Sequence, residues 1–438
     1  MKKIKRRAMS ATIVALLVVT GLFVYLLRYV NDGTDWALSV INRNLYVDGV
    51  LNSGTIRDRN DMLLASTENG LVYAEDSAVR TSCLHIVGDF SGNIGSSVLN
   101  AFADTLTRYN LITGAYSFRD VEETVVLSID SALNVTAYNA LNGRKGAVVV
   151  MNYKTGEVLC MVSSTSYDPM NKPADLSGDY YDGVYLNRAI HVTYPPGSVF
   201  KIITLTAALE EINNISEQTF TCSGSMDIDG NTVVCSGTHG TQDIRTAFAN
   251  SCNCAFAELS LQLGAETLRD YAETFGITES MELDGIGTRA GNFDIAENDT
   301  ALAWSAIGQS TDLVSPISMA CVAAAVANEG RLVFPTVLLN GDNGSDRLIP
   351  RSTANTVAEF MQNNVLTNYG QSRFPGLNLC AKTGTAEVSN GAAHSWFVGF
   401  LDDEAHPYAF AVIAENSGSG LGTAGVIANT VLQAAVSR

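Results

Sequence analysis

Residues 146–164 read GAVVVMNYKTGEVLCMVSS, and this stretch decides the fold. Two apolar runs flank Lys154-Thr155-Gly156, which is the pattern of two strands joined by a tight turn. The C-terminal part adds three strand-like segments and a closing helix, and the middle of the chain is helical. Strands, then helices, then an antiparallel run predict an α+β fold with one antiparallel sheet packed by helices. The strand-like segments are 377–388, 394–401 and 408–416, and the helical ones are 198–212, 254–276, 315–330 and 423–438.

The residues before this sheet predict a small mixed domain. GTIRDRNDMLLA (54–65) indicates a strand, a turn and a strand, and residues 93–110 have helical apolar spacing. TVVLSID (124–130) predicts a strand, followed by a helix over 131–141 with Asp130 as its N-cap. The expected domains are therefore 1–30 (cytoplasmic tip and anchor), 31–141 (non-catalytic pedestal) and 142–438 (catalytic).

The N-terminus has the pattern of a membrane anchor. Five basic residues stand within the first seven, and residues 8–27 carry no charge. A helix of about twenty residues covers about 30 Å, which is one bilayer core. The basic flank predicts a cytoplasmic N-terminus and an outer C-terminal part. A cleaved signal peptide is the alternative, but the apolar run is long and ends in Tyr25-Leu26-Leu27-Arg28 rather than in small residues.

The charge balance excludes one class of partner. The chain has 27 Lys and Arg against 45 Asp and Glu, for a net charge of -18. A chain this acidic repels phosphate backbones, so we expect no nucleic-acid partner.

The segment Ser198–Lys201 (SVFK) is the first candidate for chemistry. Its hydroxyl and amine are three residues apart and share one face of a helix. Serine needs a base to become a nucleophile, and a lysine can be that base when desolvation lowers its pKa. Pro195-Pro196-Gly197 sets the start of this helix. An ordinary surface Ser and Lys pair is the alternative that this spacing alone leaves open.

Two further motifs follow. Ser251-Cys252-Asn253 places a hydroxyl and an amide at the start of a helix, although an N-cap serine would give the same pattern. Lys382–Thr385 (KTGT) lies in a strand-like run and offers a cation, hydroxyls and a glycine that permits close approach of a ligand. Each motif has a second copy, at Ser91-Gly92-Asn93 and at Lys154-Thr155-Gly156, and we interpret the latter as a turn.

In this order, SxxK, SxN and KTG resemble the motifs of the penicillin-binding protein and serine β-lactamase superfamily. The stretches 54–65, 146–171, 187–210 and 306–332 are also similar to that family in kind. The resemblance implies a serine β-lactamase/transpeptidase-like domain. The chain departs from the family at Ser310, where a glycine is usual, and "RTSCLHIVGD" lacks the usual Tyr-Pro.

The resemblance also implies acyl transfer on stem peptides that end in D-Ala-D-Ala. Ser198 would attack the penultimate carbonyl, Lys201 would be the base, and Ser251 would relay the proton. The oxyanion hole would be the backbone N–H groups of Ser198 and Thr385. No cofactor or metal is implied. The residues implied to bind substrate are Asn253, Lys382, Thr383, Gly384 and Thr385.

Among the relatives, the best match is a class B, monofunctional D,D-transpeptidase. A bifunctional enzyme needs a glycosyltransferase domain, for which residues 31–141 are too few. A carboxypeptidase usually has a C-terminal anchor, and a β-lactamase usually has none. A β-lactam sensor needs a cytoplasmic signalling segment. The resemblance implies as partners peptidoglycan stem peptides, β-lactam antibiotics and a SEDS-family glycosyltransferase in the membrane.

The cysteines suggest one disulfide bond and no metal. Eight are scattered along the chain without a CxxC, and the five histidines show no zinc-type pairing. Cys222 and Cys235 flank a predicted hairpin with its turn at Asp229-Gly230-Asn231. Because the compartment outside the membrane permits oxidation, we expect these two to form a disulfide, with two unpaired cysteines as the alternative.

Overall fold

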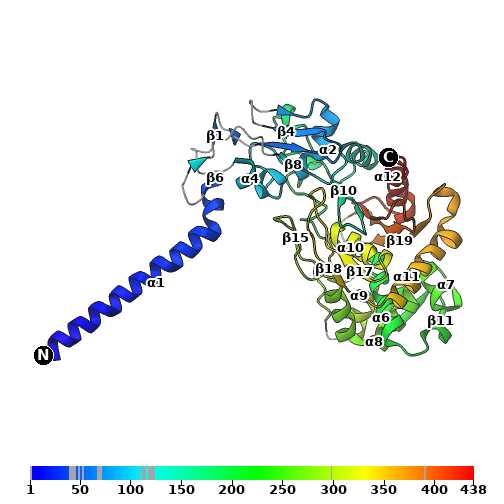
Figure 1. The fold of residues 1–438 in the computed structure, drawn as a ribbon. Coiled ribbons are helices and arrows are strands. Elements are labelled where there is room, and N and C mark those ends of the chain that lie inside the picture. The colour runs from blue at the N-terminus through cyan, green and yellow to red at the C-terminus, as the bar shows by residue number, and fades with distance from the viewer. Residues whose placement is uncertain are drawn as a thin grey trace.

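A computed structural model shows the fold of the chain (Figure 1). It describes residues 2–38, 46–47, 50–51, 54–66, 72–107, 109–110, 115–116, 124–296, 298–388 and 391–438.

Helix α1 (Lys2–Leu38) projects away from the rest of the molecule (Figure 1). Within it, Met9–Tyr29 is long and apolar enough to cross a membrane, with a mean hydropathy of 2.4. None of this stretch is buried against the other residues that the structure describes. The helix is therefore compatible with a single-pass membrane anchor, close to the predicted run at 8–27.

The centre of the fold is a five-stranded sheet in the order β10-β9-β21-β20-β19, antiparallel throughout. The turn between β9 and β10 is the one predicted at Lys154-Thr155-Gly156. Strand β19 carries the Lys-Thr-Gly motif and lies at one edge, so one side of its backbone pairs with no other strand of this sheet. The strands are β9 (Gly146–Asn152), β10 (Val158–Ser164), β19 (Leu379–Ala386), β20 (His394–Leu401) and β21 (Tyr408–Ala414).

Helices cover both faces of this sheet, which confirms the predicted α+β class. Because side chains alternate along a strand, Val148 and Val150 of β9 face α5 (Ser131–Leu141) and α12 (Gly425–Val436). Val149 belongs instead to the larger core, which includes α10 (Pro316–Ala327). The other helices of this part are α6 (Lys201–Glu211), α7 (Ile244–Ala249), α8 (Asn253–Thr274), α9 (Asp299–Ala306) and α11 (Arg351–Asn364).

A smaller sheet precedes the central one, in the order β5-β4-β3-β8. Strands β3 and β4 form the strand, turn and strand predicted over 54–65. The helix predicted over 93–110 is shorter and broken, because Phe102 leaves helical geometry between α3 and α4. Residue 108 lies outside the described residues. The elements are β3 (Thr55–Arg57), β4 (Leu63–Ser66), β5 (Val72–Tyr73), α2 (Ser77–Val87), α3 (Val98–Ala101), α4 (Ala103–Thr107) and β8 (Thr124–Val126).

Helix α5 lies between the two parts of the protein. Asp130 is its N-cap, as predicted, and accepts a hydrogen bond from the Leu133 N–H. Its buried residues Leu133, Ala137 and Leu141 pack with the central sheet, and α2 packs on it as well. The domain boundary placed after residue 141 stays a prediction.

Short two-stranded pairs complete the described strands. They are β1 (Tyr46–Val47) with β2 (Val50–Leu51), β6 (Tyr109–Asn110) with β7 (Ala115–Tyr116), β11 (Thr219–Cys222) with β14 (Gly240–Asp243), β12 (Ser225–Ile228) with β13 (Asn231–Val234), β15 (Glu282–Leu283) with β16 (Ile286–Gly287), and β17 (Arg331–Val333) with β18 (Ser345–Arg347).

Candidate active site

Ser198 and Lys201 meet at the start of α6. Ser198 lies in a short 3₁₀ turn, η4 (Gly197–Val199), and Lys201 is the first residue of the helix that follows. The Lys201 Nζ atom is 3.2 Å from Ser198 Oγ. Lys201 is completely buried whereas Ser198 is half-buried, so of these two residues only the serine keeps access to solvent.

The Ser251–Asn253 segment, at the start of α8, contacts Lys201 of the Ser198–Lys201 pair. Cys252 rather than Ser251 is the N-cap residue, and Ser251 has a φ of 51°, a left-handed conformation that is uncommon for serine. This geometry places Ser251 Oγ 3.3 Å from Lys201 Nζ. The alternative interpretation of Ser251 as an N-cap is therefore wrong.

The hydrogen bonds of Lys201 are compatible with a neutral amine. Its Nζ donates to the Ser251 carbonyl and to Asn253 Oδ1, both at 2.7 Å. When the amine is neutral, these two acceptors would use both of its N–H groups and leave its lone pair for the hydroxyl of Ser198 or Ser251. Burial lowers the pKa of Lys201 to about 8, partly opposed by the neighbouring thiols of Cys235, Cys252 and Cys254.

Lys382, on β19, contacts the hydroxyl of Ser251. Its Nζ donates to Ser251 Oγ at 2.9 Å and to the Thr383 carbonyl at 3.1 Å, and its side chain is completely buried. Burial and then the charge of Lys201 hold the pKa of Lys382 well below its ordinary value. Lys201 and Lys382 are both buried beside the Ser251 hydroxyl, so a state in which both amines are charged is disfavoured. This repulsion assists proton movement among the two amines and the hydroxyl.

Glycines let η4 pack closely against β19. Gly197 has a φ of 55°, and a Cβ atom there would lie 2.7 Å from the Thr385 carbonyl oxygen. A Cβ on Gly384 would lie 2.9 Å from the Pro196 carbonyl oxygen. The Trp396 indole N–H donates to the Pro195 carbonyl at 3.0 Å and stabilises the same contact between η4 and β19. The backbones of Ser198 and Thr385 are therefore brought side by side.

The threonines of the third motif lie on the other side of β19 from Lys382. Thr385 is exposed, and its Oγ1 accepts a bond from the Gly420 N–H at 3.4 Å. Tyr369 contacts Thr383, because its hydroxyl accepts from the Thr383 N–H at 3.1 Å and lies 3.2 Å from Thr383 Oγ1. No motif in the sequence indicates Tyr369, which ends a π-helical turn (Val365–Tyr369) directly after α11.

Asn253 is engaged at both ends of its amide group. Besides accepting from Lys201, it donates from Nδ2 to the Val234 carbonyl at 2.8 Å. It therefore connects the buried amine to the β12–β13 hairpin.

The second copies of the motifs lie apart from this cluster. Lys154 is exposed in the turn between β9 and β10, where its Nζ donates to Asn328 Oδ1. Asn93 bonds with Asp89 in a loop after α2. The structure thus brings together Ser198, Lys201, Ser251, Asn253 and Lys382, with Gly384, Thr383 and Thr385 beside them on β19.

The predicted disulfide between Cys222 and Cys235 is not present. The predicted hairpin does form from β12 and β13 and brings the two cysteines near each other. All eight cysteines are nevertheless free. The reason is that each thiol faces other partners: Cys222 Sγ lies 3.6 Å from Cys254 Sγ, and Cys235 Sγ lies 3.9 Å from Cys252 Sγ.

The comparisons with known proteins agree with this geometry. The family description "Penicillin binding protein transpeptidase domain" matches residues 146–433. The peptidoglycan D,D-transpeptidase PbpA of Mycobacterium tuberculosis is 31% identical over 331 residues, which cover 67% of each chain. Stage V sporulation protein D of Bacillus subtilis is 33% identical over 55% of this chain and 39% of its own length.

Solved structures give the same result. The crystal structure of PBPA from M. tuberculosis matches with a TM-score of 0.76 and 25% identity, covering 88% of this chain and 99% of that chain. Its ceftriaxone acyl-enzyme complex matches with a TM-score of 0.75 and 26% identity over 88% and 98%. This chain belongs to the penicillin-binding protein transpeptidase family, and it fits the class B members.

Proposed function

We propose that this protein is a serine D,D-transpeptidase that cross-links peptidoglycan stem peptides and is acylated by β-lactams. One observation carries the proposal: the buried Nζ of Lys201 lies within 3.3 Å of the hydroxyls of both Ser198 and Ser251. A base between a nucleophile and a second hydroxyl can take a proton from one and pass it towards the other. The relatives named D,D-transpeptidases support the substrate class.

Acylation begins when neutral Lys201 takes the Ser198 proton. Ser198 Oγ then bonds to the penultimate D-alanine carbonyl, and the negative charge moves to the carbonyl oxygen. The Ser198 and Thr385 N–H groups form the oxyanion hole in this proposal, which the close packing of Gly197 on Thr385 supports. When the peptide bond breaks, the proton moves from Lys201 through Ser251 to the leaving D-alanine amine. The amine of a second stem peptide then attacks the acyl-enzyme carbonyl, the bond to Ser198 Oγ breaks, and the proton lost by the amine returns through Lys201 to Ser198 Oγ.

The third motif binds the substrate in this proposal. Strand β19 is an edge strand, so an extended peptide can pair with its outer side beyond Thr383, whose N–H and carbonyl already bond Tyr369 and Lys382. Thr383 and Thr385 would hold the terminal carboxylate, and Gly384 leaves room for close approach. Lys382 adjusts the charge at Ser251 Oγ, and Asn253, which is half-buried, fixes Lys201 and positions the peptide.

The proposed topology places the N-terminus in the cytoplasm and the catalytic domain outside. Lys2, Lys3, Lys5, Arg6 and Arg7 precede the apolar stretch of α1, which supports this orientation. We also propose a SEDS-family glycosyltransferase as a membrane partner that packs against this exposed stretch. A photo-crosslinker at Val18 should then join the two proteins, and crosslinking of lipid alone would count against it.

Fluorescent penicillin tests the proposed function. Wild-type membranes should show a labelled band, Ser198→Ala should show none, and Ser91→Ala, in the second copy of the SxN motif, should label normally. Labelling of folded Ser198→Ala would refute the nucleophile. Fast loss of the acyl group with release of hydrolysed penicillin would indicate a β-lactamase instead.

A further inference from the structure

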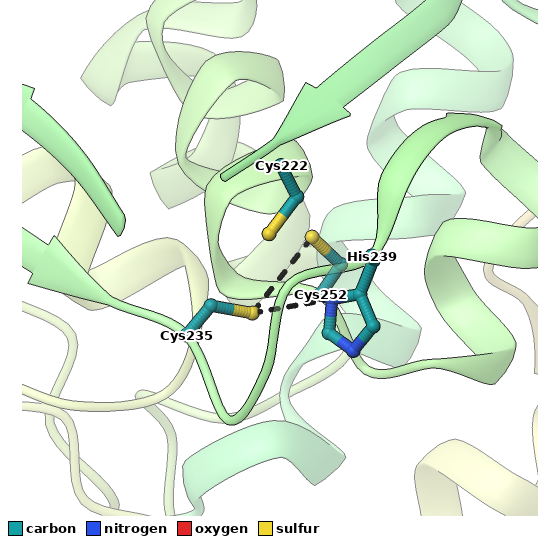
Figure 2. Close-up of side chains that lie close together, drawn as sticks. All are labelled: Cys222, Cys235, His239 and Cys252. Carbon is teal, nitrogen blue, oxygen red and sulfur yellow. Dashed lines mark hydrogen bonds between the residues drawn. The ribbon is translucent and has the colours of Figure 1, made fainter. Parts of the chain in front are cut away.

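Four soft ligand atoms converge beside the proposed active site. The Sγ atoms of Cys222, Cys235 and Cys252 and a ring nitrogen of His239 all lie within 4.8 Å of one another (Figure 2). Cys222 ends β11, Cys235 and His239 lie in the segment between β13 and β14, and Cys252 caps α8. In Figure 2 the four side chains point towards a common centre. The three cysteines are buried and His239 is half-buried.

The spacing of these atoms fits a tetrahedral metal centre. With bonds of about 2.3 Å to sulfur and about 2.0–2.1 Å to nitrogen, tetrahedral ligands stand about 3.8 Å apart for S–S and about 3.6 Å apart for S–N. Cys235 Sγ lies 3.9 Å from Cys252 Sγ and 3.5 Å from His239 Nδ1. A disulfide would need the two sulfurs at about 2.05 Å.

The surroundings also suit a thiolate ligand. The Asn253 N–H donates to Cys235 Sγ at 3.3 Å, and such a bond favours the ionised sulfur that a metal requires. Cys254 Sγ lies 3.6 Å from Cys222 Sγ but does not belong to the group of four. A set of three thiolates and one imidazole is a known structural zinc set, and its soft ligands disfavour magnesium and calcium.

We propose that Cys222, Cys235, His239 and Cys252 form a structural Zn²⁺ site. Local spacing in the sequence does not indicate this group, because its four members come from three separate segments of the chain. The site would connect the β11–β14 strand pair and the β12–β13 hairpin to the start of α8. Cys252 stands between Ser251 and Asn253, so the metal would hold the SxN motif in register with Lys201. We call this a positioning role, since none of the four ligands contacts the reacting atoms.

Metal analysis of the detergent-purified full-length protein tests the site directly. Purification without chelator should give about one zinc per chain by mass spectrometry, as expected for one four-ligand site. Replacement by Co²⁺ should produce the sulfur-to-cobalt charge-transfer bands and the visible bands of a tetrahedral site. Cys252→Ser and His239→Gln should lose the metal. Cys321→Ser, in α10, and Cys254→Ser should keep it.

Two results would overturn the proposal. One is wild-type protein without zinc, its cysteines either free to alkylation or joined in a disulfide. The other is bound metal that persists in both ligand variants. If those variants do not fold, chelator treatment of wild-type protein followed by Co²⁺ addition decides the question, because absence of the cobalt bands then refutes the site. The readout is metal content, so it does not depend on transpeptidase activity.

Discussion

Lys201 can act as a base only in its neutral form, because only then can it accept the Ser198 proton. An arginine side chain stays protonated and cannot do this. We therefore expect Lys201→Arg to slow acylation by penicillin by at least about 100-fold, although the positive charge is kept. Stopped-flow measurement of acyl-enzyme formation gives this rate, and thermal unfolding checks the fold. Lys154→Arg is the matched control, since Lys154 is exposed in a turn and should leave the rate unchanged. Normal acylation by Lys201→Arg would exclude Lys201 as the base.

The pH dependence of acylation follows from the same amine. Burial lowers the pKa of Lys201 to about 8, so Lys201 is mostly protonated below that pH and mostly neutral above it. The acylation rate of the wild-type enzyme should rise as pH increases through about 8 and then level off. Measurement between about pH 6 and about pH 9.5 covers this range. A rate that falls as pH rises through it would contradict a neutral lysine base.

At the residue scale, sequence predicted the groups that local spacing connects and missed those that only the fold connects. Ser198 and Lys201 are three residues apart, so a single turn brings them together. Tyr369 reaches Thr383 from the end of a π-helical turn, and His239 reaches Cys252 across a loop. Ser310 shows that a substitution can keep the backbone geometry, since it has a φ of 71°, a conformation in which glycine costs least.

At the scale of elements, the close packing of η4 against β19 depends on Gly197. We expect Gly197→Ala to reduce penicillin acylation by at least about tenfold, because a Cβ atom would push against the Thr385 carbonyl and separate the two oxyanion donors. The left-handed φ adds a further cost of about 1–2 kcal/mol in unfolding free energy. Acylation kinetics and chemical denaturation measure the two effects.

Gly276→Ala separates backbone strain from the steric contact. Gly276 has a φ of 69°, close to that of Gly197, but a Cβ atom there would meet nothing within 4 Å. This variant should lose similar stability and keep the acylation rate of the wild type. Equal acylation by the two variants would show that the close approach to Thr385 does not matter for the reaction.

Helices and strands were predicted best where the spacing of apolar residues and the turn or cap residues at their ends indicated the same structure. Strands β9 and β10 with their turn, and the N-cap of α5, are examples. The helix expected over 93–110 was wrong in length, because its apolar spacing continues past the point where Phe102 interrupts the helical backbone. The prediction of a disulfide between Cys222 and Cys235 was wrong for another reason. The hairpin was correct, but the β11–β14 pair and α8 bring further thiols to the same place.

At the scale of the whole molecule, the anchor and the site are separate. The site residues lie on η4, α6 and β19 and at or just before the start of α8, and the apolar stretch of α1 is not buried by any described part of the chain. We therefore expect deletion of residues 1–28 to give a protein that is soluble without detergent. It should react with penicillin at the rate of the undeleted protein in detergent, because residues 1–28 provide no hydrogen-bond partner to Ser198, Lys201 or Lys382. Size-exclusion chromatography and acylation kinetics measure the two outcomes. A truncated protein that unfolds at the normal temperature but is not acylated would mean that α1 or the membrane helps to build the site.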